Sequence, residues 1–245
     1  MPLTLSSGVA SARAFGFVGT TPSYLMTYLV IGGGASGSSG YFGTYFGSGG
    51  ASGTAKTGTL TLSKGTVYTA TIGNGGASVS GNGSSGLAGT QSSLNSIVAT
   101  GGNATPATNV GGANADYSGG VTGGGQGYRT QSGGGGAGSA ANGYGANGGN
   151  GIQSSITGSA IYYAGGGVGQ VYSDETATNG LGQSTYGGGG AGTLNGYSSQ
   201  AGNPGVVILK VPTAIYSGTV TGSPSVTTSG AYKIITFTSN GTYTS

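Results

Sequence analysis

The chain has 245 residues, of which 61 are glycine and only 4% are charged, and its formal net charge is +3. It has no cysteine and no histidine, which excludes disulfides, thiolate metal sites and the commonest catalytic bases. The six cations are scattered along the sequence, so no basic patch for nucleic acid is expected. Glycine-rich chains are often disordered, but disorder usually comes with the high net charge that this chain lacks.

No segment predicts export or membrane insertion. The first twenty residues contain no continuous apolar stretch of the kind found in signal peptides. The longest mostly apolar run, residues 24–31, is too short to span a bilayer. We therefore expect a protein made in a cytoplasm, without a signal peptide and without membrane insertion.

Short apolar or alternating stretches predict β-strands. The clearest are YLMTYLVI at residues 24–31, LNSIVATGG at 94–102, GVVILKVP at 205–212 and the tail YKIITFTSNGTYTS, which has a turn at Asn240-Gly241. Residues 59–76 alternate apolar and polar positions on both sides of Lys64-Gly65, which predicts a β-hairpin closed by a two-residue turn. No segment has the apolar period of a helix, so essentially no α-helix is expected.

Long glycine tracts with Ser, Ala, Asn and Tyr separate these strands, roughly at residues 32–53, 101–151 and 165–205. They lack the period and the proline of collagen. An ordered tract with so few side chains must be held by its backbone groups, which polyglycine-II helices of three residues per turn direct outward to neighbouring segments. We expect a mostly β and irregular fold, with short β-strands and hairpins and a bundle of parallel and antiparallel polyglycine-II helices.

The sequence GGGGAG occurs at residues 133–138 and again at 187–192, and each copy fits the G-x-G-x-x-G pattern of dinucleotide-binding loops. That function needs a strand before the loop, a helix after it and an acidic residue about twenty positions later. The first copy follows the polar YRTQS and precedes the non-helical SAANGYGANGGNG, and neither copy has the acidic residue. We interpret both copies as packing segments, in which Gly135→Val or Gly189→Val would damage folding.

The succession TYLVIGGGASG, GTLTLSKGTVYTATIGNGG, NSIVATGGN, two long Gly/Asn/Tyr tracts and GNPGVVILKVP resembles the glycine-rich domain of phage tail-fibre and adhesin proteins. The tail after Ala214 looks like the end segment of such proteins in phages of marine and cyanobacterial hosts. The resemblance covers nearly the whole chain from Tyr24. Composition along the chain indicates an N-terminal lead or anchor at residues 1–22, a glycine-rich polyglycine-II domain with flanking β-strands at 23–212 and a C-terminal β segment at 213–245, where glycine becomes less frequent.

The same resemblance implies a virion protein whose distal loops touch the host. The expected partners are a host-surface glycan or outer-membrane protein, other tail proteins and further copies of the chain, for which a trimer is the form common among fibres. Aromatic and charged residues in the glycine tracts are the receptor-binding candidates: Tyr41, Phe42, Tyr45, Phe46, Tyr117, Tyr128, Arg129, Tyr172, Asp174, Glu175 and Tyr197. Each of these tyrosines could instead pack against glycine backbone as part of the core.

Two other functions compete with this interpretation. The chain could be a purely structural virion or filament component, a decoration or adaptor protein whose loops bind neighbouring subunits. An ice-binding surface would need a regular array of Thr or Ala, and the tracts are too irregular for one. The only carboxylates are Asp116, Asp174 and Glu175, which form no recognisable catalytic pair, so we expect neither an enzyme nor a bound cofactor or metal.

Overall fold

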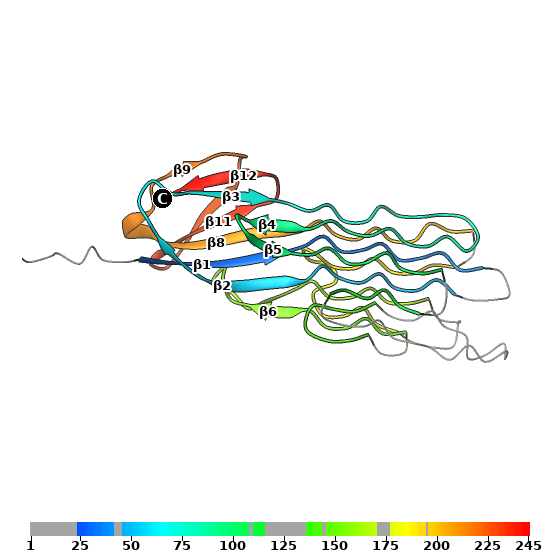
Figure 1. Ribbon diagram of the computed structural model, residues 1–245. Coiled ribbons are helices and arrows are strands. Elements are labelled where there is room, and N and C mark those ends of the chain that lie inside the picture. The colour runs from blue at the N-terminus through cyan, green and yellow to red at the C-terminus, as the bar shows by residue number, and fades with distance from the viewer. Residues whose placement is uncertain are drawn as a thin grey trace, which may run out of the picture.

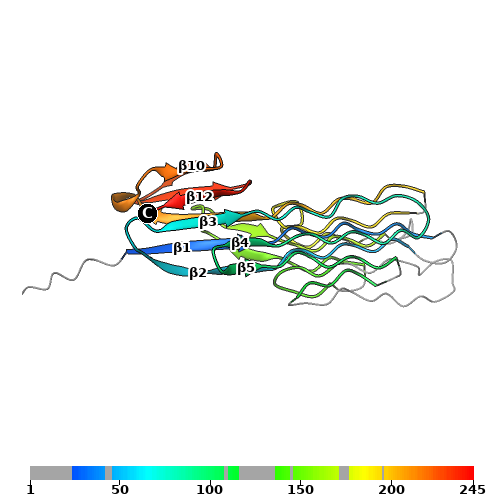
Figure 2. The same ribbon diagram turned by 45° about the horizontal axis from the view of Figure 1, so that its top comes forward.

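The computed structural model describes residues 24–41, 46–107, 110–115, 136–143, 146–170, 177–194 and 196–245. Two stacked β-sheets occupy one end of the molecule, and a bundle of extended glycine segments projects from the other (Figure 1 and Figure 2). The C-terminus lies among the strands, at the end away from the bundle (Figure 1). Within the described residues, the one helical element is a single 3-10 turn, η2 (Thr213–Ile215). The mostly β fold with essentially no α-helix is confirmed.

In the described part of the chain, the strands form two five-stranded sheets and one two-stranded sheet, and every pairing between these strands is antiparallel. The first sheet has the order β10-β11-β8-β1-β2, with β1 at Tyr24–Ile31, β2 at Ala55–Leu62, β8 at Val206–Pro212, β10 at Ser225–Ser229 and β11 at Tyr232–Phe237. The second has the order β5-β4-β3-β12-β9, with β3 at Val67–Thr71, β4 at Ser92–Leu94, β5 at Ile97–Ala99, β9 at Thr219–Val220 and β12 at Gly241–Thr244. The third pairs β6 (Ile152–Ser154) with β7 (Ile161–Tyr163).

The central strands of the first sheet, β1 and β8, contribute side chains to cores on both faces, which explains their continuous apolar runs. Alternate residues of a strand point to opposite faces. In β1, Met26 and Val30 enter the core between the two large sheets, whereas Leu29 and Ile31 enter a second core against the β6–β7 hairpin. Strands buried on both sides lose the apolar–polar alternation, and β8 shows the same pattern. The C-terminal residues complete both large sheets, because β10 and β11 join the first and β9 and β12 join the second.

The prediction of a hairpin across Lys64-Gly65 was wrong. Thr66 does donate a backbone hydrogen bond to Ser63 at 3.0 Å, so a turn forms there. The chain nevertheless crosses from one sheet to the other, since β2 pairs with β1 whereas β3 pairs with β12 and β4. The alternating apolar residues on the two sides of the turn therefore meet across the core between the sheets, as Leu60 and Tyr68 do.

Glycine segments follow β1, β3, β5 and β7 and precede β2, β4, β6 and β8. We call residues 32–40, which follow β1, the central segment. Its backbone N–H groups donate in turn to three antiparallel segments, and each partner recurs every third residue. The first set of bonds is Gly32 to Thr54, Ala35 to Ala51 and Ser38 to Ser48; the second is Gly33 to Thr90, Ser36 to Leu87 and Ser39 to Ser84; the third is Gly34 to Asn203 and Gly37 to Gln200.

Three parallel segments donate back to the central segment. Gly102 bonds to the carbonyl of Gly33, Gly76 to that of Gly34 and Gly190 to that of Ala35, at 2.8–2.9 Å. The central segment thus has six neighbours, three that accept its bonds and three that donate to it. A partner that recurs every third residue is the mark of a helix with three residues per turn. The predicted bundle of parallel and antiparallel polyglycine-II helices is therefore present.

Several glycines of this bundle leave no room for a β carbon. At Gly34, such an atom would overlap the backbone carbonyl of Gly188, and at Gly189 it would overlap that of Gly50. The Gly50 carbonyl already accepts a hydrogen bond from Gly167 at 2.9 Å, so it cannot move without breaking a contact to a third segment. The second GGGGAG copy is therefore a packing segment, as predicted. Of the first copy, only residues 136–138 lie within the described part of the chain, and Gly135 lies outside it.

We predict that Gly189→Val strongly destabilises the bundle. The side chain would overlap backbone atoms rather than a movable side chain, so the cost should be at least about 3 kcal/mol, the upper end for overpacking. Urea unfolding monitored by circular dichroism measures it. The control is Ala88→Val, at an exposed position of a neighbouring segment, which should change the free energy of unfolding by less than about 0.5 kcal/mol. A Gly189→Val protein as stable as this control would contradict the packing described.

A second prediction concerns alkaline pH. Burial raises the pKa of Tyr163 and of Tyr243 above the usual 10.0. Above pH 10 the unfolded chain therefore releases protons that the folded chain still binds, so the free energy of unfolding should fall as pH rises. The double variant Tyr163→Phe, Tyr243→Phe should reduce the difference in stability between about pH 9 and about pH 11, as urea unfolding can measure. Tyr197→Phe, at an exposed position, should leave this difference unchanged.

Candidate functional site

The loops at the far end of the bundle, opposite the sheets, form the candidate site, and we call this region the distal end. Backbone hydrogen bonds connect several of its segments to one another. Gly40 and Gly47 both donate to the carbonyl of Thr193, at 3.0 and 3.1 Å. Gly83 donates to Gly40 at 3.0 Å, and Gln170 donates to Gly47 at 2.8 Å. These bonds therefore join described residues from four parts of the sequence that are far apart: Gly40 and Gly47, Gly83, Gln170 and Thr193.

Two of the predicted candidates are exposed at the distal end. Tyr41 follows Gly40 directly and is 47% exposed, and Tyr197, in the turn after Thr193, is 67% exposed. Phe46 precedes Gly47 and is partly buried. The bonds of Gly40 and Gly47 to Thr193 bring these three aromatic residues to the same end of the bundle.

A tight turn presents Tyr197. Its backbone N–H donates to the carbonyl of Leu194 at 3.3 Å. Gly196, inside this turn, has a φ of 81°, a conformation that glycine adopts without steric cost. Ser199, just after the turn, donates to Val79 at 2.8 Å, and Val79 donates to the Ser199 hydroxyl at 3.1 Å. The turn is thereby fixed to a neighbouring segment.

The remaining candidates lie outside the described residues: Phe42, Tyr45, Tyr117, Tyr128, Arg129, Tyr172, Asp174 and Glu175. The nearest described neighbours of two of these groups do lie at the distal end. Residues 42–45 fall between Tyr41 and Phe46, and residues 171–176 follow Gln170.

Apolar side chains that were not singled out from the sequence also belong to this region. Leu194 begins the turn of Tyr197 and is 41% exposed. Its signal in the sequence was an isolated leucine directly before an Asn-Gly pair, in TLNGYSS. In tracts this rich in small residues, a large apolar side chain beside a turn has little core in which to be buried.

Among the described residues, charged side chains occur in the sheet region and not in the glycine bundle. All described cations are lysines of the sheet region: Lys56, Lys64, Lys210 and Lys233. No described residue of the glycine bundle is charged. Over the same described ranges, no three acidic, histidine or cysteine side chains come together as metal ligands would, and no helix is long and apolar enough to cross a membrane. The described part of the distal end therefore exposes aromatic, apolar and uncharged polar groups.

One comparison with known proteins agrees with this architecture. A family model described as a glycine-rich domain matches residues 14–212. This range contains the glycine segments together with the strands from β1 to β8. A search of curated proteins finds no match to the chain.

Proposed function

The chain belongs to the family of glycine-rich domains, and from this premise we propose that it is a phage tail-fibre or adhesin protein that recognises a receptor on the host surface. The distal end would carry the contacts, and the sheet end would face the particle. The observation that carries the proposal is the exposure of Tyr41 and Tyr197 on turns fastened together at the tip of a stiff bundle.

The construction of the bundle supports this role. Each glycine segment is hydrogen-bonded to several others along its length, so the turns at its end have fixed starting points. A rigid site loses little conformational entropy on binding. Tyrosine adds a large contact area and a hydroxyl at low entropic cost, which makes it a common residue in recognition loops.

The chemistry of the described distal end favours a neutral or weakly charged receptor surface. With no charged side chain among the described bundle residues, affinity there would come from aromatic stacking, apolar contact and hydrogen bonds. A glycan or the polar loops of an outer-membrane protein would both supply suitable partners. Binding through this surface should depend little on salt.

The competing proposal is a structural virion component. Its support is at the sheet end, where Leu25 is 54% exposed and Val67 is 50% exposed. Both residues lie near strand ends on the side away from the bundle (Figure 1). Exposed apolar residues there favour contacts with other particle proteins or with further copies of the chain, which either function would use.

Competition for host adsorption tests the receptor proposal. Purified chain should block attachment of the phage that carries it, and Tyr197→Ser should raise the concentration required for half-maximal inhibition by about tenfold or more. The control is Tyr24→Ser, a partly exposed tyrosine at the sheet end, which should compete like the unchanged protein. Absence of inhibition at saturating protein would overturn the receptor proposal. If Tyr197→Ser also impaired particle assembly, the structural alternative would be favoured.

A further inference from the structure

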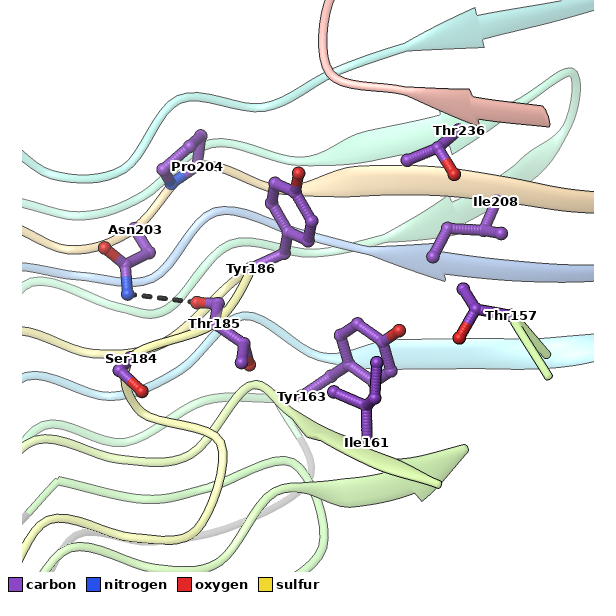
Figure 3. A pocket seen from close by; sticks show the side chains of 10 residues that line it. All are labelled: Thr157, Ile161, Tyr163, Ser184, Thr185, Tyr186, Asn203, Pro204, Ile208 and Thr236. Atoms are coloured by element: carbon purple, nitrogen blue, oxygen red, sulfur yellow. Dashed lines mark hydrogen bonds between the residues drawn. The ribbon is translucent and has the colours of Figure 1, made fainter. Parts of the chain in front are cut away.

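A pocket opens beside the second core, far from the distal end, where the first sheet, the β6–β7 hairpin and the start of the glycine bundle meet (Figure 3). Its volume is about 540 Å³, within the range of about 300–1,000 Å³ that is typical of small-molecule sites. Thr157 and Tyr163 belong to the β6–β7 hairpin, Tyr186 and Asn203 to the bundle side, and Ile208 to β8.

The polar groups of this pocket are uncharged. Its lining contains hydroxyls and one carboxamide, and no acidic or basic side chain. A charged ligand would lose its hydration there without gaining an opposite charge, which is unfavourable. A wholly apolar ligand would cover the hydroxyls and leave them without hydrogen bonds, which is also unfavourable. The ligand that fits is neutral and carries hydroxyl groups of its own.

Two atoms of the pocket lining, the Thr157 hydroxyl oxygen and the Asn203 side-chain oxygen, can each make a further hydrogen bond. The hydroxyl oxygen of Thr157 is buried and has no hydrogen bond within the described part of the chain. The Tyr163 hydroxyl lies beside it. Burial raises the pKa of Tyr163 and Thr157 lowers it by a smaller amount, but the two hydroxyls do not meet the geometry of a hydrogen bond. Asn203 donates its amide hydrogens to the carbonyl of Gln183 at 2.7 Å and to that of Thr185 at 3.0 Å, of which Figure 3 shows the second, so its side-chain oxygen is left to accept.

Aromatic and apolar surfaces accompany these polar atoms. Tyr163 is 3% exposed and Ile208 is 1% exposed, so both are firmly held by the second core. Tyr186 packs against the same core and places a second ring beside the pocket (Figure 3). A ligand with apolar C–H faces and a rim of hydroxyls would meet both kinds of surface at once, and a pyranose ring has this character.

We propose that this pocket binds one neutral sugar residue, with a C–H face of the ring against Tyr186 and its hydroxyls bonded to Thr157 and Asn203. The site would be separate from the receptor contacts of the distal end, since its residues belong to the sheet core and to the base of the bundle. It does not depend on the function proposed above.

Titration with three methyl glycosides tests the site. The probes are methyl α-D-glucopyranoside, methyl α-D-galactopyranoside and methyl α-D-mannopyranoside, and binding is followed by amide chemical shifts of the full chain. At least one should bind with a dissociation constant of about 1 mM, with the largest shifts near Tyr163 and Tyr186. N-acetylneuraminic acid, which is charged, should not bind.

Thr157→Val distinguishes a ligand contact from a structural role. Because the Thr157 hydroxyl has no hydrogen bond within the described residues, its removal should leave the melting temperature unchanged or raise it. Binding of the best glycoside should weaken by about tenfold. A lower melting temperature with unchanged glycoside affinity would overturn this assignment.

A blocking variant completes the test. Ser184 is exposed at the edge of the pocket, and Ser184→Trp should fill the entrance and abolish glycoside binding. Ser78→Trp, at an exposed position outside the pocket, is the matched control and should bind normally. The proposal is overturned if none of the three glycosides binds at saturating concentration, or if binding survives Ser184→Trp. Tyr197→Ser should retain glycoside binding, so failure here and failure of the receptor proposal can be told apart.

Discussion

Backbone hydrogen bonds that recur every third residue between neighbouring glycine segments are the interaction on which the bundle depends. Ordering a residue costs about 1–2 kcal/mol of conformational entropy, and glycine loses the most. A single backbone hydrogen bond returns only about 0.5–1.5 kcal/mol net. A glycine bundle therefore needs almost every N–H and C=O to be bonded, and the central segment meets that requirement by having neighbours on six sides. Such close contact requires backbone to lie against backbone, which explains the glycine content.

The sheets make this arrangement possible by fixing where each glycine segment starts. Hydrophobic burial on both faces of the first sheet sets the positions of β1 and β8, from which the central segment and one of its antiparallel partners extend. The apolar side chains that the bundle lacks are concentrated in the strands. The packed cores therefore lie at one end of the molecule, and the exposed turns of Tyr41 and Tyr197, where we propose the receptor contacts, lie at the other. The pocket lies at the junction of the two regions.

The sequence was sufficient for the kind of fold but not for its pairings. The apolar runs of β1 and β8 and the polyglycine-II bundle could be predicted, because runs buried on two faces and glycine tracts without collagen periodicity each leave few structural choices. The hairpin at Lys64-Gly65 could not be rejected, since apolar alternation is the same whether two strands pair in one sheet or face each other across a core. At the distal end, composition indicated Tyr41 and Tyr197, whereas Leu194, which begins the turn of Tyr197, comes to the same end as Tyr41 only through hydrogen bonds between distant segments. The pocket could not be predicted from the sequence, because Thr157, Asn203 and Ile208 come together only when the β6–β7 hairpin packs on the first sheet.

Residue-resolved hydrogen exchange of the full chain, followed by NMR, tests the central claim most directly. If the central segment is held by its neighbours on six sides, the amides of Gly33, Gly34 and Ser36 should be protected to nearly the same extent as those of β1, because both would exchange only when the core opens. The amide of Tyr197, in an exposed turn, should exchange much faster. Rapid exchange of the central segment while β1 remains protected would contradict the account, since it would mean that the glycine segments are not held by mutual backbone hydrogen bonds.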